Sequence, residues 1–239
     1  MSRTVFITGG SGGIGGAAVR EFSAAQYNVA FTYNKNEENA KKLCSEIPGS
    51  LALRCDVSSA ADVNAAAQAA IHRFGKIDVL INNAAISRQS LFTDITEDEW
   101  DEMINVNLKS CFLTCKAVLP QMISRKDGVI INISSMWGIT GASCEVHYSA
   151  AKSGVIGLSK ALAKEVGPSG IRVNAVAPGV IDTAMNSHLG AEVMDELREE
   201  IPLGKIGTPE DVAKTLVFLA GNGGKYITGQ VISVDGGWV

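Results

Sequence analysis

The sequence has no excess of basic residues and no apolar run long enough to cross a membrane. Its 21 lysine and arginine residues are outnumbered by 25 acidic ones, which leaves a net charge of −4. Nucleic-acid-binding proteins normally carry a basic surface, and a transmembrane helix needs about 18 or more apolar residues in succession. We therefore expect neither a nucleic acid nor a membrane among the partners of this chain.

Signals for secretion, disulfide bonding and metal binding are also missing. The N-terminal residues lead almost at once into an apolar run, without the h-region and cleavage site of a signal peptide. The five cysteines are an odd number, they include no Cys-x-x-Cys pair, and no histidine stands near Cys111 and Cys115 to suggest zinc. We expect a cytoplasmic protein with reduced thiols and no metal.

What the sequence does contain is an alternation of apolar runs and helical stretches. Its 239 residues are 46% hydrophobic, which excludes disorder and fits a single α/β domain over residues 1–239. Apolar runs bounded by turn signals occupy 4–8, 28–33, 51–57, 77–81, 128–133, 171–177 and 230–234. Helical patterns occupy 14–26, 36–47, 60–74, 97–125, 147–167 and 209–221. This order predicts a parallel sheet of about seven strands with helices on both faces. The stretch 182–204 is the longest candidate for an active-site flap.

A glycine-rich turn follows the first predicted strand. Residues 8–15 read Thr-Gly-Gly-Ser-Gly-Gly-Ile-Gly, in which Gly10, Gly12 and Gly15 match G-x-G-x-x-G. A second pattern, Thr-Gly-x-x-x-Gly-x-Gly from Thr8, fits equally. Glycine turns also serve tight packing, but one between a strand and a helix N-terminus favours a dinucleotide pyrophosphate. No Gly-Lys-Ser/Thr follows, which excludes a P-loop.

The end of the second predicted strand bears on the choice of dinucleotide. Enzymes that use NAD usually place a carboxylate there for the ribose hydroxyls. Here the strand ends in Tyr33-Asn34-Lys35-Asn36, and the first acid is Glu37. Asn34 and Lys35 therefore favour NADP(H) over NAD(H), unless Lys35 is an ordinary solvated surface charge.

Three polar residues suggest acid–base chemistry. Ser135 follows the predicted strand 128–133, and Tyr148 and Lys152 stand four apart at the start of a predicted helix, so they share a face. A tyrosine hydroxyl with a pKa near 10 is a poor acid at neutral pH. We expect the Lys152 ammonium to lower that pKa, with Ser135 holding a carbonyl oxygen that Tyr148 protonates.

With these residues the chain resembles the short-chain dehydrogenase/reductase family over almost its whole length. The matching motifs are the glycine turn, Asp56-Val57, Asn82–Ala85, Asn107, Ser135, the Tyr148/Lys152 pair, Pro178–Thr183 and Val234–Gly237. The resemblance implies a Rossmann-type doubly wound sheet, hydride transfer from nicotinamide to a carbonyl group, and protonation by the tyrosine. Relatives that only sense a cofactor typically lose the tyrosine or the lysine, and this chain keeps both.

The resemblance also implies residue roles. The pyrophosphate would lie on Gly9, Ser11, Gly12, Gly13, Ile14 and Gly15. Asp56 and Val57 would lie at the adenine, Asn83 and Lys152 at ribose, and Ile181 and Thr183 at the carboxamide. Tyr148, Pro178 and Gly179 would be further cofactor contacts. Asn107 would join the catalytic group by supporting a proton relay, or serve as a helix-kink residue. Two departures are Ala85, where glycine is usual, and Gly12, where many NADP-dependent relatives carry arginine.

Within the family the chain most resembles bacterial 3-oxoacyl-(acyl-carrier-protein) reductases. This likeness implies a ketone substrate, small or bound to a carrier protein, and a homotetramer packed through a segment like 229–239. Carrier proteins are acidic, so a basic dock near the site mouth is expected. Arg125 and Lys126 are candidates for it, but Ser169 stands where relatives often have a second basic residue.

The loop between Ser135 and Tyr148 is expected to line the substrate site. Trp137 suits a fatty chain, whereas Glu145 and His147 suit a cationic or hydrogen-bonding group. The loop resembles that of reductases that modify elongation factor P by reducing a 5-aminopentanone group. Glu145 would then bind the amine of such a substrate; the alternative is that Glu145 points into solvent.

Overall fold

Seven parallel strands form one sheet within residues 2–186 and 190–239, which the computed structural model describes. The spatial order is β3-β2-β1-β4-β5-β6-β7. The strands are β1 (Thr4–Ile7), β2 (Asn28–Tyr33), β3 (Leu51–Arg54), β4 (Val79–Asn82), β5 (Gly128–Ile133), β6 (Ile171–Pro178) and β7 (Val231–Val234). The order reverses next to β1, which creates a switch point where a ligand can bind beyond the strand ends.

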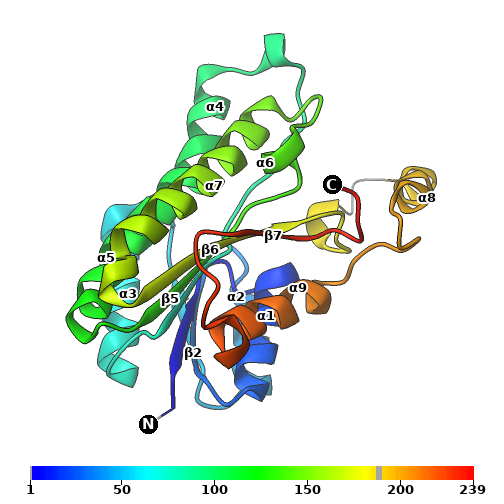
Figure 1. Ribbon diagram of the computed structural model, residues 1–239. Coiled ribbons are helices and arrows are strands. Elements are labelled where there is room, and N and C mark those ends of the chain that lie inside the picture. Colours follow the sequence, from blue (N-terminus) through cyan, green and yellow to red (C-terminus); the bar gives the residue numbers. More distant parts are fainter. Residues whose placement is uncertain (1, 187–189) are drawn as a thin grey trace.

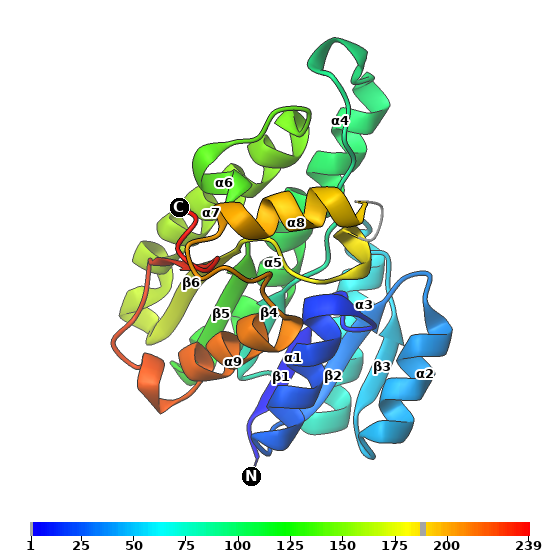
Figure 2. The ribbon, with the colours of Figure 1, turned by 90° about the vertical axis from the view of Figure 1, so that its right-hand side faces the viewer.

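Helices cover both faces of this sheet (Figures 1 and 2). One face carries α1 (Gly13–Ala24), α2 (Glu37–Glu46) and α9 (Pro209–Ala220), and the other carries α3 (Ala60–Phe74), α5 (Ser110–Arg125) and α7 (Val146–Val166). Along β1, Val5 and Ile7 join the first core while Phe6 joins the second, because side chains alternate along a strand. The predicted Rossmann-type α/β fold is confirmed.

The predicted helix 97–125 is interrupted. It consists of α4 (Glu97–Ile104), a π-helical turn over Asn105–Lys109, and α5. A capping box between Thr96 and Glu99 begins α4. Since a π-turn inserts one extra residue into the helical ladder, it changes the direction in which nearby side chains point.

The remaining elements lie near the carboxyl ends of the strands or in connections. They are α6 (Trp137–Thr140), α8 (Ala191–Glu200) and the 3₁₀ turns Phe92–Asp94, Gly167–Ser169, Ala184–Asn186 and Asn222–Gly224. Helix α8 occupies much of the predicted flap 182–204, of which residues 187–189 lie outside the described residues. In the described part of the chain, no helix is both long and apolar enough to span a membrane.

Candidate active site

A cavity of about 960 Å³ opens beyond the carboxyl ends of the strands. Its walls come from the segments that follow β1 to β6 and from α7, which is where a doubly wound sheet binds its ligands. The predicted site residues on these walls are Gly9, Ser11, Gly12, Gly13, Ile14, Asn34, Lys35, Asp56, Val57, Asn83, Ser135, Trp137, Glu145, Tyr148, Lys152, Pro178, Gly179, Ile181 and Thr183.

Three predicted residues are not on the cavity wall. Gly15 lies behind the glycine turn, where an added Cβ would meet the Gly9 carbonyl oxygen, so its role is close packing. Asn107 is completely buried behind the wall. His147 is also completely buried, and neither ring nitrogen has a hydrogen-bond partner among the described residues. The structure therefore does not bring His147 to the substrate side of the cavity.

The glycine turn is supported from β4. Gly9 has a φ of +66° and lies so close to Ala84 that a Cβ would stand 2.8 Å from the Ala84 Cα. The Asn83 amide donates hydrogen bonds to the Thr8 and Gly9 carbonyl oxygens, at 3.1 and 3.0 Å. The Thr8 hydroxyl accepts one from the Asn83 backbone N–H at 3.0 Å. Asn83 and Thr8 thus hold the turn open toward the cavity, a role that the sequence analysis missed for both.

This turn fits a dinucleotide phosphate. It ends at Gly12, the N-cap of α1, where no side chain caps the helix. The free N–H groups of the first helical turn and the helix dipole attract an anion there. Within residues 2–186 and 190–239, no group of three or more His, Cys, Asp or Glu side chains is arranged to hold a metal ion.

Ser135, Tyr148 and Lys152 meet at one side of the cavity. All three are buried, and the Ser135 hydroxyl is close enough to Tyr148 to affect its ionisation. The Lys152 ammonium donates a hydrogen bond to the Ile133 carbonyl oxygen at 2.9 Å. The Ser134 hydroxyl donates to the Lys152 carbonyl oxygen at 2.8 Å, which ties the end of β5 to α7. The predicted sharing of a helix face by Tyr148 and Lys152 is what brings both into the cavity.

Burial, rather than the neighbouring charge, dominates the ionisation of this group. Burial raises the pKa of Tyr148 to about 12, opposed by the Ser135 hydrogen bond and reinforced by the Glu145 charge. Burial also lowers the pKa of Lys152 to about 8. The expectation that Lys152 lowers the pKa of Tyr148 is therefore wrong for this structure. A protonated phenol is nonetheless the form that can donate a proton.

Asn107 lies in the π-turn and holds the wall after β4. Its Oδ1 accepts a hydrogen bond from the Ile86 N–H at 3.0 Å, and its Nδ2 donates to the Ile86 carbonyl oxygen at 2.9 Å. Ile86 lines the cavity. Asn107 thus joins the helical interruption to the cavity wall, in keeping with its interpretation as a helix-kink residue.

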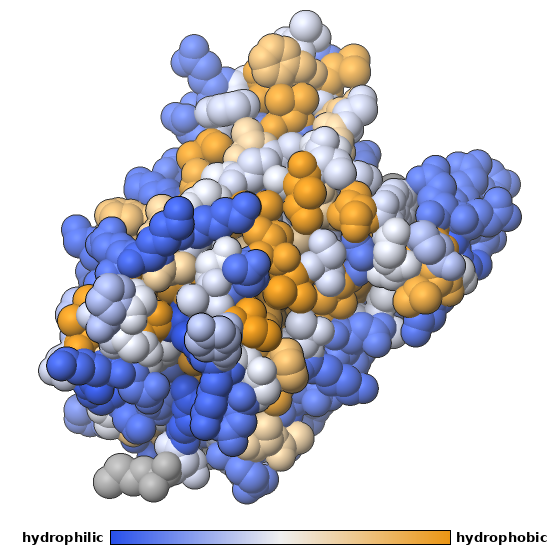
Figure 3. Space-filling view, in the orientation of Figure 1, coloured by the Kyte–Doolittle hydropathy of each residue, from blue (hydrophilic) through white to orange (hydrophobic). Residues whose placement is uncertain are grey.

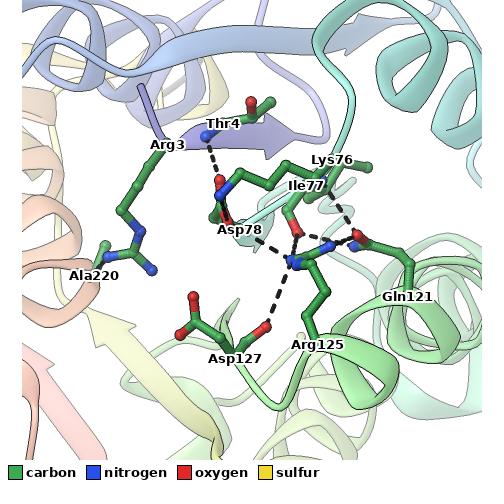
Figure 4. A network of polar contacts seen from close by, with 9 residues as sticks. All are labelled: Arg3, Thr4, Lys76, Ile77, Asp78, Gln121, Arg125, Asp127 and Ala220. Atoms are coloured by element: carbon green, nitrogen blue, oxygen red, sulfur yellow. Dashed lines mark hydrogen bonds and ion pairs between the residues drawn. The ribbon is translucent and has the colours of Figure 1, made fainter. Parts of the chain in front are cut away.

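Lys35 and Arg125, the basic residues expected to bind a cofactor phosphate and a carrier protein, lie at opposite ends of the strands. Lys35 is exposed on the cavity wall, and no acidic partner is paired with it within the described ranges. Arg125 lies at the other ends of the strands, beside Asp78, which directly precedes β4; Figure 4 shows its guanidinium turned toward Asp78 and Ile77. There its guanidinium donates to the Ile77 carbonyl oxygen at 2.9 Å and faces the buried Asp78 carboxylate at 3.6 Å.

Asp78 organises the amino ends of β1 and β4. It also accepts a hydrogen bond at 2.8 Å from the N–H of Thr4, the first residue of β1, and pairs with Lys76 at 2.9 Å. Arg125 therefore does not lie at the cavity mouth of its own protomer, and the expected basic dock at that mouth is wrong for this residue. Its charge is used to compensate a buried carboxylate.

Comparisons with known proteins agree with this architecture. A family model described as enoyl-(acyl carrier protein) reductase matches residues 9–239. The chain is 44% identical over 242 residues to 3-oxoacyl-(acyl-carrier-protein) reductase FabG of Chlamydia trachomatis, covering 99% of this chain and 97% of that protein. It is 40% identical over 241 residues to the Staphylococcus aureus protein of the same name, covering 99% and 98%.

The chain therefore belongs to the short-chain dehydrogenase/reductase family. It is an NAD(P)-dependent oxidoreductase that acts on a ketone group, as the sequence motifs indicated.

Proposed function

We propose that this protein reduces the ketone of a 3-oxoacyl thioester, presented by an acyl carrier protein, at the expense of NADPH. The observation that carries the proposal is the meeting of Ser135, Tyr148 and Lys152 beside an apolar wall of the cavity. The relatives named 3-oxoacyl-(acyl-carrier-protein) reductase support the same substrate class.

In the proposed reaction, nicotinamide supplies the hydride when it is bound. The Ser135 hydroxyl and the Tyr148 hydroxyl both face the cavity and together bind the ketone oxygen. Tyr148 gives its proton to that oxygen as negative charge develops on it. Lys152 keeps a positive charge behind the tyrosine, anchored on the Ile133 carbonyl.

The proposed cofactor site follows the cavity from the glycine turn to the end of β6. The pyrophosphate lies on the turn and the N-terminus of α1, and Asp56 and Val57 bound the adenine end. Pro178, Gly179, Ile181 and Thr183 bound the nicotinamide end. Lys35 and Asn34 favour the 2′-phosphate of NADPH, because no acid on that stretch of wall would repel it.

We also propose that the protein works in the cytoplasm as a homotetramer. Apolar side chains that a monomer leaves exposed support the assembly: Phe112 and Ile123 on α5, and Phe218, Tyr226 and Val239 near α9 and the C-terminus. Figure 3 shows apolar side chains gathered over β7 and the C-terminal tail. Sedimentation equilibrium tests the homotetramer, and a purely monomeric species would contradict it.

A substrate panel run in parallel with NADH and NADPH tests the reaction. We expect oxidation of NADPH with acetoacetyl thioesters, faster than oxidation of NADH, and faster still when the thioester is on acyl carrier protein. Nucleotide binding without turnover of any ketone would contradict the proposed function.

A second candidate is favoured by Glu145, which lies on the cavity wall near Tyr148. Its carboxylate accepts hydrogen bonds from Ser87 at 3.5 Å and Gln89 at 3.4 Å, and it pairs with no basic side chain in the described part of the chain. An acyl chain gains nothing from this charge, whereas an ammonium group does. The candidate substrate is an amine-bearing ketone, such as the 5-aminopentanone group on elongation factor P.

Comparing wild type with Glu145→Gln tests this candidate. We expect the variant to reduce an amine-bearing ketone with a KM about tenfold higher, while acetoacetyl thioester turnover is unchanged. Glu102→Gln is the matched control, because Glu102 also lines the cavity but already faces Arg88 at 3.6 Å. Equal rates of wild type and Glu145→Gln with the amine would exclude the candidate.

A further inference from the structure

The C-terminal tail after β7 is folded back into a defined turn. The Asp235 carboxylate accepts hydrogen bonds from the backbone N–H groups of Gly237 at 3.0 Å and Val239 at 3.1 Å. These two bonds fix the direction of the last residues. Figures 1 and 2 show the C-terminus beside α6 and the end of α8.

The tail is also joined to the segment that follows α8. The Leu203 N–H donates to the Gly236 carbonyl oxygen at 3.1 Å. Gly236 has a φ of +70°, and a Cβ there would stand 2.5 Å from the Ile201 side chain. The tail and the residues after α8 therefore pack as one unit.

Trp238 connects this unit to the cavity wall. Its ring lies 6.1 Å from that of Trp137, at an interplanar angle of 76°, which is an edge-to-face contact. Trp137 lines the cavity, and its backbone N–H donates to the Ser135 hydroxyl at 3.2 Å. Trp238 itself is not on the cavity wall.

The two indoles belong to one apolar cluster. Its buried members are Met136, Val180 and Ile201, and the partly buried ones are Trp137, Met194, Leu197, Ile206 and Trp238. Met136, Val180 and Leu197 line the cavity together with Trp137. The cluster is thus the apolar wall of the cavity, and Trp238 packs behind it.

We infer that Trp238 is a positioning residue that sets the shape of the apolar wall and so determines which acyl chains the site accepts. Without the Trp238 ring, Trp137 loses its outer support and the wall becomes deformable. A long acyl chain needs that wall, whereas a short one does not reach far along it. The nature of the substrate in this inference rests on the proposed function.

Kinetics of Trp238→Ala test the inference. We expect the KM for a long-chain 3-oxoacyl thioester to rise about tenfold, with kcat, NADPH affinity and the KM for acetoacetyl thioester changed less than about twofold. Trp238→Phe keeps an aromatic ring in place and is expected to restore most of the long-chain KM. Trp100→Ala is the matched control, because Trp100 is exposed on α4 and belongs neither to the cavity wall nor to the apolar cluster. Equal changes for the long and short thioesters would overturn the inference, because a general loss of structure does not discriminate between them.

A second measurement does not depend on the proposed function. The chain has three tryptophans, Trp100, Trp137 and Trp238, so a nitrogen–proton correlation spectrum of the indole groups is simple to assign. In Trp238→Ala we expect the Trp137 indole signal to shift and the Trp100 signal to stay. An unshifted Trp137 signal would overturn the inference even if the wild type reduces thioesters. A wild type that reduces no thioester would instead overturn the proposed function.

Discussion

The Nζ atom of Lys152 lies 5.6 Å from the centroid of the Tyr148 ring and 2.9 Å from the Ile133 carbonyl oxygen. The lysine charge is thus held behind the phenol by the end of β5. Burial displaces both groups toward their neutral forms, with the pKa of Tyr148 raised to about 12 and that of Lys152 lowered to about 8. At neutral pH the phenol is protonated and the ammonium is still charged, which suits proton donation.

Replacing Tyr148 with phenylalanine removes the proposed proton donor and leaves the ring. We expect kcat for ketone reduction to fall by about 10²- to 10⁴-fold while NADPH still binds. Turnover is followed by NADPH oxidation, and binding by NADPH fluorescence. Tyr226→Phe serves as the control, since Tyr226 is fully exposed. Retention of most of the rate in Tyr148→Phe would show that another group gives the proton.

The pH dependence of reduction follows from Lys152. Its pKa is lowered by burial to about 8, so the ammonium is present below that pH and lost above it. We expect kcat/KM for ketone reduction to be constant near neutral pH and to decline as pH rises through about 8. Tyr148, with a pKa of about 12, does not titrate in this range. A pH–rate profile that stays flat to about pH 10 would contradict the role of the lysine charge.

The same burial predicts that Lys152 lowers stability. Its folded-state pKa of about 8 is below the ordinary 10.5, so the unfolded state binds the proton more tightly. The resulting decrease in the free energy of unfolding is fully present below about pH 8. It becomes smaller as the pH rises and is absent above about pH 10.5. The difference corresponds to roughly 3 kcal/mol, and a variant that removes the ammonium also loses its hydrogen bond to the Ile133 carbonyl oxygen.

We therefore expect Lys152→Met to be more stable than the wild type but inactive. At pH 7 we expect the free energy of unfolding to increase by about 1–2 kcal/mol, with the gain vanishing near pH 10.5 and reduction lost at every pH. Urea denaturation at both pH values measures the change. Lys160→Met, at an exposed position of α7, is the control. A less stable Lys152→Met at pH 7 would contradict the argument.

Cofactor choice is predicted to depend on Lys35 and Gly12. Lys35→Ala removes the exposed cation of the cavity wall and should lower the preference for NADPH over NADH about tenfold. Lys42→Ala, at an exposed site on α2, is the control.

Gly12 has an extended backbone, and a Cβ there would meet no atom within 4 Å. Gly12→Arg therefore fits without strain, and we expect it to tighten NADPH binding and leave NADH binding unchanged. Equal affinities of both variants and wild type for NADPH would show that the 2′-phosphate binds elsewhere.

Much of the fold and of the candidate site could be predicted because the relevant patterns are local. The alternation of apolar runs and helical patterns reflects the burial of a parallel strand on both faces. Strand lengths were less predictable: the apolar run 51–57 ends as a strand at Arg54, because Asp56 turns the chain by accepting a hydrogen bond from the Ser58 N–H. The helix expected over 97–125 contains a π-turn, for which no sequence pattern was recognised.

By itself the sequence determined the class of fold, the phosphate turn, and the presence of Tyr148 and Lys152 on one helix face, because each depends on spacing within a single element. Only the tertiary structure decided that His147 is buried away from the cavity and that Arg125 pairs with Asp78 at the amino ends of the strands. It also decided that Trp238 supports Trp137. The physical reason is that spacing determines which residues share a face, whereas the packing of whole elements determines what that face meets.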